Sequence, residues 1–467
     1  MKKYFLFAAV AGMLASCSSE SLTGSDPNIE PTQEDRVPIE INVASAQTKA
    51  TTRGSGTVGG TTAGTNAWNG QKVNVFMFNQ NSLNLAEDNP GAGDYIYNNT
   101  ALTTPSDGSA SGLAYEYLTA STIKHRYYPQ GRNFDFWGYY KDDAAGAAPD
   151  ATNPVASELV GGDTEVRVPF TINGTQDLMT AKAVPTAAEI TALGTRGTDF
   201  YSAYAARKNV QPNLTFKHLL TRLTFTVQGG NATACGWKKT GTWSGPAVGD
   251  HYNGVFVKSI SIKSQNSGYI VAAYTRADMS GDTRYQDPTK MIKFDNTTTA
   301  PATDPDNYVP FYLMNPDDDG NGQLDPLYSW TPITATDLIV TAAGPDNYHS
   351  IYKPTCSTTD ASDDNAFTFD QVKVGDAMLI QPRASYVMEI ELGQYLLDVE
   401  DITNPLNNTY IVKSSTISDI PVALNSGSFE AGKSYNINVT VWGYEEILIT
   451  TTLEQWVDGG NVDAEYE

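Results

Sequence analysis

Residues 214–227 have the sequence LTFKHLLTRLTFTV, and their pattern indicates the fold class. Apolar and polar residues alternate with a period of two, which predicts a half-buried β-strand. The alternation changes phase at Thr221-Arg222, which indicates a β-bulge or a bend between two sheets. A polar, alanine-rich stretch precedes it and glycines follow it, so we expect this strand to open a second β-domain.

Similar strand patterns recur along the chain, and only residues 186–207 favour a short helix. The other predicted strands cover residues 37–45, 72–78, 95–97, 123–128, 134–140, 166–172, 254–263, 269–274, 308–314, 337–341, 377–380, 386–392, 435–441 and 447–453. From the length of 467 residues we expect an all-β protein with two mostly antiparallel β-sandwich domains in tandem, at 37–208 and 209–467.

The charge balance bears on the class of partner. The formal net charge is −23, from 30 basic and 53 acidic residues. A nucleic-acid partner needs a basic face, so this balance argues against one. The same balance suits a soluble surface outside the cell.

The N-terminal residues 1–16 have the pattern of a secretory signal. Lys2 and Lys3 precede an apolar run that is too short to cross a membrane. Cys17 stands at the expected cleavage point and completes a lipobox-like LASC, so we expect acylation of its thiol. Plain secretion with Cys17 as a spare thiol is the alternative. Residues 17–36 then form a polar, acylated tether.

The first predicted strand is followed by a Thr- and Gly-rich loop at residues 46–70. Its apolar side chains alternate, and Pro38 near its start favours an edge strand. These side chains are Val37, Ile39, Ile41 and Val43. Arg53 lies in the loop, the kind of exposed segment that proteases cut, although it also fits an ordinary solvated arginine.

Six passages, spread from the middle of the first half to the end of the chain, match the motifs of one known family. They are YYPQGRNFDFWGYY at 127–140, QDLMTA at 176–181, FKHLLTRLTFTV at 216–227, AMLIQP at 377–382, SFEAGKSY at 428–435 and WVDGG at 456–460. Through them the chain resembles the fimbrillin-like (Mfa-like) lipoproteins, the subunits of type V pili in Bacteroidales.

The resemblance implies transthyretin-like β-sandwich domains and a lipid-anchored fimbrial subunit, either a pilin or a tip adhesin. It implies palmitate-type acylation at Cys17 and display on the outer-membrane surface. It further implies an arginine-specific cut after Arg53, with Arg36 as the competing site, and loss of the strand that carries Val37, Ile39, Ile41 and Val43. A strand from another fimbrial subunit would then fill the vacated groove. The acidic tail VDGGNVDAEYE after Trp456 is a poor donor strand, which favours a tip or accessory subunit.

Two glycine-rich matches do not predict nucleotide binding. Residues 54–59 fit G-x-G-x-x-G, and residues 427–434, GSFEAGKS, fit the P-loop pattern. Both motifs need a helix directly after them, whose first N–H groups face the phosphates. More Gly and Thr follow the first, and an alternating strand pattern follows the second.

An acidic loop at 317–325 is the candidate metal site. Its oxygen ligands fit the order of a calcium loop and are Asp317, Asp319, Asn321, Gln323 and Asp325. Position 12 is Tyr328, which cannot supply the usual bidentate carboxylate. The alternative is a solvated acidic turn. We expect no other cofactor.

The remaining residue types do not predict an enzyme. No histidine pair has zinc spacing, and His218 fits a hydrogen-bonded core histidine. No serine elbow or free cysteine nucleophile stands out. Cys235 and Cys356 form a disulfide or remain two buried thiols. The main alternative function is an outer-membrane glycan-binding lipoprotein that is not polymerised, and a host or bacterial surface glycan or protein is a candidate ligand.

Overall fold

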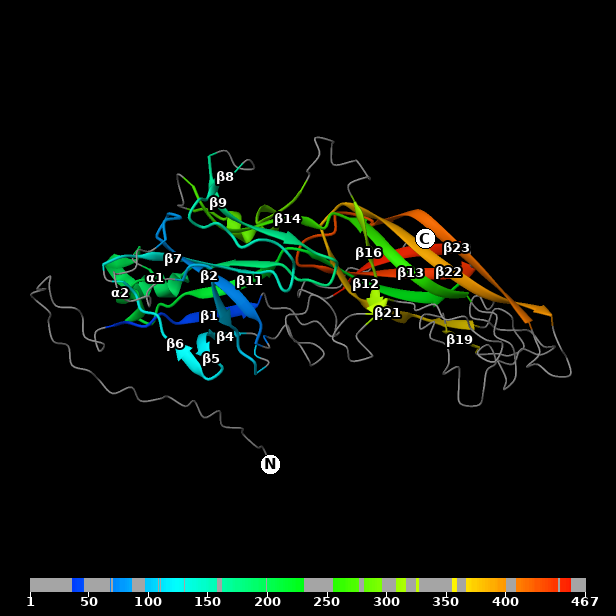
Figure 1. Ribbon diagram of the computed structural model, residues 1–467, viewed down its shortest axis with the longest axis horizontal. Coiled ribbons are helices and arrows are strands. Elements are labelled where there is room, and N and C mark those ends of the chain that lie inside the picture. The colour runs from blue at the N-terminus through cyan, green and yellow to red at the C-terminus, as the bar shows by residue number, and fades with distance from the viewer. Residues whose placement is uncertain are drawn as a thin grey trace, which may run out of the picture.

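The computed structural model (Figure 1) describes part of the chain. The described residues are 36–45, 68, 70–85, 97–107, 109, 111–129, 131–157, 162–198, 200–230, 255–276, 281–295, 308–315, 325–326, 355–358, 367–399, 409–443 and 446–454. Their regular elements are nearly all β-strands, so the predicted all-β fold class is confirmed. The number of separate sandwich domains remains a prediction. No described helix is long and apolar enough to cross a membrane.

A seven-stranded sheet organises the first half. Its strand order is β3 (Thr100–Thr103), β2 (Lys72–Asn79), β7 (Phe134–Tyr140), β10 (Met179–Lys182), β11 (Asn213–His218), β1 (Ile41–Ser45) and β4 (Ser111–Ala114). Neighbours are antiparallel except β1 and β11, which run parallel. All residues of β7 are buried, because both faces of the sheet are covered.

The two edges of this sheet meet, so it curls into a barrel-like layer. Thr103 of β3 and Tyr115, directly after β4, exchange two backbone hydrogen bonds of 2.8 and 3.0 Å. Inside lies a cluster that we call the barrel core. It contains Ile39, Ile41, Val43, Trp68, Val73, Val75, Met77, Tyr97, Leu102, Ala114, Tyr128, Phe134, Phe136, Tyr140, Met179, Ala181, Ala183, Leu193, Tyr201, Ala205, Ala206, Val210, Leu214 and Phe216.

The phase slip in residues 214–227 is a bend between sheets, as the sequence indicated. β11 ends at His218, and β12 (Thr221–Gly229) enters a different sheet with β21 (Val372–Ile380), β24 (Ser434–Gly443) and β25 (Glu446–Glu454). β11 pairs with β10 and β1, so the strand that begins near residue 214 belongs to the sheet of the first half, and the domain boundary at 208 remains a prediction. β12 opens the second-half sheet.

A second sheet packs on that one to form a sandwich. Its order is β16 (Val309–Tyr312), β13 (Val255–Ser264), β22 (Ser385–Val399) and β23 (Thr409–Ala423). The sequence did not predict β23. Its segment is polar, KSSTISD at 413–419, and contains Pro421, so it lacks the alternation of a half-buried strand.

The two halves share one sheet. β9 (Thr164–Thr171) from the first half pairs with β14 (Ser267–Thr275) from the second, flanked by β8 (Val155–Ala156) and β15 (Ile292–Phe294). One hydrophobic cluster, from Phe76 through Val168 to Val441, follows this connection. Strand pairing therefore crosses the split expected near residue 208.

Short elements complete the described chain. The helices are α1 (Ala187–Leu193) and α2 (Ala203–Ala206), where one helix was predicted, with 3-10 turns η2 (Gly194–Arg196), η3 (Arg284–Gln286) and η4 (Pro288–Lys290). The small strand pairs are β5 (Glu116–Thr119) with β6 (Thr122–Lys124), β17 (Met314–Asn315) with β18 (Asp325–Pro326), and β19 (Thr355–Thr358) with β20 (Phe367–Asp370). The predicted strand 123–128 is β6 plus a single bridge at Tyr127. Tyr97, from the predicted strand 95–97, is not in a strand, and residues 337–341 lie outside the described chain.

Candidate functional site: the slot of the first strand

The first strand lies inside the sheet, between β11 and β4. Val43 is in register with Leu214 on the parallel side and with Gly112 on the antiparallel side. The edge position that Pro38 suggested is therefore wrong, because β4 covers the outer side of β1. Pro38 precedes the strand and makes a single bridge with Tyr127. We call the space that residues 37–45 occupy the β1 slot.

The inward face of the strand is deeply buried in the barrel core. Ile39, Ile41 and Val43 expose 7%, 1% and 0% of their surface, and Val37 packs against the same core while partly buried. Burying one such side chain contributes about 1.5–3 kcal/mol, so the three together contribute about 5–9 kcal/mol. That is comparable to the whole stability of many domains, so an empty slot would be costly.

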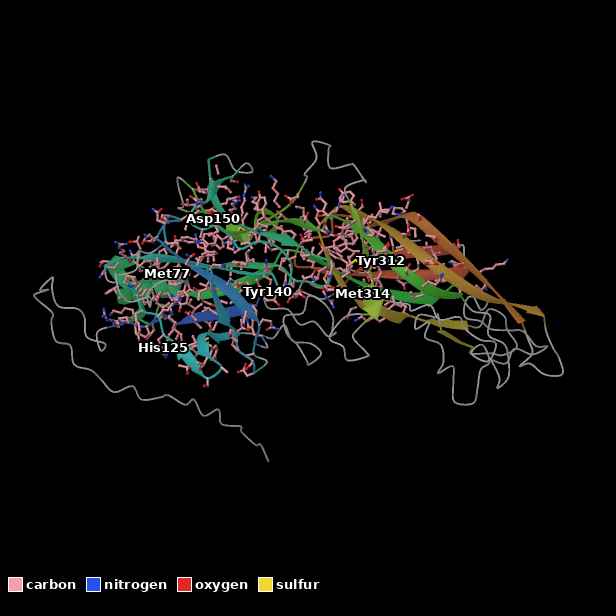
Figure 2. The ribbon with its side chains drawn as sticks, viewed as in Figure 1. Met77, His125, Tyr140, Asp150, Tyr312 and Met314 are labelled. Carbon is pink, nitrogen blue, oxygen red and sulfur yellow. The ribbon has the colours of Figure 1, made fainter. Side chains whose placement is uncertain are left out.

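Aromatic residues form the floor of the slot. Phe216 of β11 packs edge-on against Trp68, with ring centroids 5.6 Å apart. Gly138 of β7 makes room for this ring, because a Cβ there would lie 2.8 Å from Phe216 Cζ. Figure 2 places Met77 of β2 and Tyr140 of β7, two further members of the barrel core, in the same half of the molecule.

The backbone of the strand is bonded on both sides beyond the regular ladder. Ile39 N donates to Arg126 O at 2.8 Å, and Tyr128 N donates to Val37 O at 3.0 Å. On the other side, Asn42 N donates to Pro212 O at 3.0 Å. The segment at 126–128 thus extends the β4 wall, and residues 211–212 extend the β11 wall.

A charged group secures the wall at Arg126. Its guanidinium pairs with Glu116 of β5, with Nε to Oε2 at 2.6 Å and Nη2 to Oε1 at 3.0 Å, and lies 4.9 Å from the Tyr97 ring centroid. Burial raises the pKa of the Tyr97 hydroxyl above its ordinary value, although the Arg126 charge acts in the opposite direction. This ion pair holds the β5 and β6 hairpin against the slot.

Most of the other predicted site residues lie outside the described chain. These are Cys17, Arg53, Cys235, Asp317, Asp319, Asn321 and Gln323. Cys356 and Asp325 fall in β19 and β18, but the structure does not describe their proposed partners. Arg36 is described, and its guanidinium lies 5.7 Å from the Tyr127 ring centroid. Lipidation, cleavage, the calcium loop and the disulfide therefore remain predictions.

The P-loop-like residues 427–434 form a turn before a strand, as predicted from the sequence. Gly427 and Gly432 take positive φ angles of 86° and 71°, and β24 follows directly. Phe429 packs between Tyr386 and Tyr435, with ring centroids 4.7 and 4.9 Å away. The strand β24, and not a helix, follows this turn, so the turn lacks the helix N-terminus that binds phosphate in a P-loop.

His218 is a core histidine, as predicted. Its Nδ1 lies 2.7 Å from Asp177 Oδ2, and both side chains are buried. Asp177 was not identified as its partner, because the two residues are distant in sequence and only the pairing of β10 with β11 brings them together. Among the described residues, no three His, Cys, Asp or Glu side chains gather as a metal site.

A buried cluster of ion pairs was also not predicted from the sequence. Arg284 of η3 contacts Asp163 at 3.2 Å and also pairs with Glu165 of β9. Arg167 donates to the same Glu165 carboxylate at 3.0 Å. Burial raises the pKa of Glu165, but the hydrogen bonds from Arg284 and Arg167 outweigh it, so its pKa lies below the ordinary value.

Comparison with known proteins finds similarity in structure only. No family model and no curated protein sequence matches this chain. A putative cell adhesion protein from Bacteroides uniformis aligns over 91% of this chain and 100% of its own, at 14% identity and a TM-score of 0.39. A fimbrial protein from Bacteroides vulgatus aligns over 90% and 99%, at 12% identity and a TM-score of 0.38.

The fimbrial anchor protein Mfa2 from Porphyromonas gingivalis aligns over 90% of this chain and 99% of its own, at 8% identity and a TM-score of 0.27. At such low sequence identities and TM-scores, the comparisons assign no functional role to any residue of this chain. By their names, these three solved structures are a cell adhesion protein, a fimbrial protein and a fimbrial anchor protein.

Proposed function

We propose that this chain is a lipid-anchored fimbrial subunit of the cell surface, and that its first strand is a removable occupant of the β1 slot. The position of β1 carries the proposal. β1 belongs to the N-terminal end of the described chain, yet both strands that pair with it come from later residues, at 111–114 and 213–216. A cut in residues 46–67 would leave the strand held by noncovalent contacts alone.

The chemistry of an emptied slot fits strand addition from another subunit. Without β1, the facing edges of β4 and β11 lose their backbone partners, and apolar side chains such as Leu214 and Phe216 lose their cover. Unpaired edges beside an apolar groove are a template for an extended strand. A donor with aliphatic side chains at alternate positions restores both kinds of contact.

The place of the cut decides whether the slot empties. Arg53 follows β1, so cleavage there releases the strand. Arg36 precedes Val37, so cleavage there leaves residues 37–45 attached to the rest of the chain. We therefore propose Arg53 as the processing site and Cys17 as the anchor of the uncut precursor, which places the protein at the outer membrane before assembly.

The first experiment is to identify the mature N-terminus on intact cells by mass spectrometry, beside an unboiled SDS gel. We expect a start at Gly54 and a ladder of high-mass species. An Arg53→Lys variant should lose both under an arginine-specific protease, and the matched Arg36→Lys variant should keep both. An acylated Cys17 start without a ladder would refute polymerisation and leave an anchor or glycan-binding lipoprotein as the function.

Glycan binding is the second candidate function, and one observation favours it. An open hollow of about 780 Å³ lies beside β4 and β5, lined by Tyr115, Tyr117 and several hydroxyl side chains. Aromatic faces with hydroxyl groups suit a neutral sugar. Glycan-array binding by the mature protein that is lost in Tyr117→Ala would support this function, and no binding on the array would refute it.

A further inference from the structure

We propose that Gln211 is a positioning residue that clamps the main chain of whichever strand occupies the β1 slot. This inference rests on the proposed function, because it concerns how a donor strand is held. Gln211 lies two residues before β11, on the wall of the slot. Its side chain forms hydrogen bonds with main-chain atoms of residues 38 and 40, just before β1, so these bonds do not require a particular side chain on the strand.

Both polar atoms of the Gln211 side-chain amide form hydrogen bonds with the strand. Its Oε1 accepts a hydrogen bond from Glu40 N at 3.3 Å, and its Nε2 donates to Pro38 O at 3.2 Å. The two bonded groups sit two residues apart on one side of the strand. The amide thus forms the same pair of hydrogen bonds that a backbone peptide group of a neighbouring strand would form. It does so two residues before β11 starts.

A second residue holds this amide against the strand. The Tyr128 hydroxyl donates to Gln211 Oε1 at 3.1 Å. Tyr128 is buried among Phe134 and Phe136, and burial raises its pKa well above the ordinary value, so the hydroxyl keeps its proton. Glu40 N–H can only donate and Pro38 O can only accept, so a flipped amide would oppose both backbone contacts.

The clamp defines which strands fit. The wall contacts require backbone N–H groups at strand positions 39, 40 and 42, which bond to Arg126 O, Gln211 Oε1 and Pro212 O. Proline, which has no N–H, is therefore excluded at these positions but allowed at position 38, where this chain has it. The occupant is an extended strand parallel to β11 with aliphatic side chains at positions 39, 41 and 43.

The first test uses the intact chain and does not depend on strand exchange. Hydrogen–deuterium exchange is followed at the Glu40 amide in the wild type, in Gln211→Ala and in Asn213→Ala. Asn213 is the matched control, because its side-chain Oδ1 accepts a hydrogen bond from the side chain of Asn42, at 3.0 Å, and not from the backbone of the strand. We expect Gln211→Ala to speed Glu40 exchange roughly three- to tenfold and Asn213→Ala to leave it unchanged. Equal exchange in all three proteins would overturn the clamp.

The second test measures strand release. A chain with a site-specific protease sequence inserted in residues 54–67 is cut, and labelled peptides VPIEINVAS compete for the slot. One peptide is N-methylated at the position of Glu40, and another at the position of Ile39, whose N–H bonds Arg126 O instead. In the wild type, both methylated peptides should dissociate faster. In Gln211→Ala, methylation at Glu40 should have no further effect, while methylation at Ile39 should keep its effect.

The outcomes separate the clamp from the proposed function. An equal penalty for methylation at Glu40 in wild type and Gln211→Ala would overturn the clamp while strand exchange stands. If the cut wild-type chain binds no peptide at all, the proposed function fails, and the exchange rate of the Glu40 amide still decides whether Gln211 holds the strand. Faster release from Tyr128→Phe would support the role of its hydroxyl in holding the amide against the strand.

Discussion

Ile41 shows how a single residue of the first strand stabilises the barrel core. Its side chain exposes 1% of its surface, and it lies between the β4 and β11 walls of the slot. Glu40, its neighbour, points to solvent and contributes mainly its backbone. Adjacent residues of one strand therefore differ sharply in how much stability their side chains supply.

Truncating the buried residue should weaken the full-length chain. Because Ile41→Ala removes buried methyl groups and leaves a cavity, we expect a loss of about 2–4 kcal/mol in the free energy of unfolding, measured by urea titration. Glu40→Ala is the control and should change it by less than about 0.5 kcal/mol. Equal effects of the two substitutions would show that the inward face of β1 does not support the core.

At the scale of elements, the Arg284 and Glu165 pair ties η3 to β9 inside the shared sheet. Both side chains are almost fully buried. Breaking a buried pair by removing one charge leaves the other uncompensated, which costs about 3–5 kcal/mol. This contact joins segments more than a hundred residues apart in sequence.

The pair also predicts a pH dependence of stability. The folded-state pKa of Glu165 lies below its ordinary value, so its stabilising contribution is present above the unfolded pKa of about 4.3 and is lost as the pH falls through the folded pKa. We expect the melting temperature of Glu165→Gln to lie well below that of the wild type at pH 7. The difference between the two melting temperatures should become smaller as the pH falls below about 4.

Thermal melts between pH 7 and pH 3 would measure this gap. Asp143→Asn, at an exposed position, is the control and should follow the wild type at each pH. A gap between Glu165→Gln and wild type that stays constant, or widens on acidification, would contradict the assignment of the low pKa to the ion pairs.

At the scale of the whole molecule, the stability of the barrel should depend on the slot being filled. In the intact chain the first strand is covalently joined to its site, so its effective concentration is high. After a cut in the loop the same contacts become a binding equilibrium. Mass action then links the melting temperature to the concentration of free strand.

We expect the cut chain to melt at a lower temperature on dilution, and added VPIEINVAS peptide to raise the melting temperature with the logarithm of its concentration. Differential scanning fluorimetry at several peptide concentrations would measure this. A peptide with aspartate in place of Ile41 is the control and should give no shift, because a buried carboxylate has no partner in the barrel core. If the melting temperature of the cut chain changes neither on dilution nor on addition of peptide, the first strand is not exchangeable.

Local pattern in the sequence was enough to locate most of the long strands, but not short ones such as β3, β4 and β10. β2, β7, β13, β14, β24 and β25 lie within two residues of their predicted bounds, because apolar alternation reflects which face of a strand is buried. The bend after β11 was visible for the same reason, since a change of buried face changes the phase. β23 was missed because its alternation is weak, and the long ladder with β22 holds it instead.

The fold class, the apolar face of the first strand and the motifs that resemble fimbrillin-like proteins could all be recognised in the sequence. The folded structure was needed to see that β1 lies between β4 and β11, that β9 pairs with β14 across the two halves, and that Gln211, Asp177 and Arg284 contact their partners. The physical reason is range. Alternation records burial residue by residue, whereas a pairing partner or a buried polar contact depends on segments that are tens to hundreds of residues apart and become neighbours only when the chain folds.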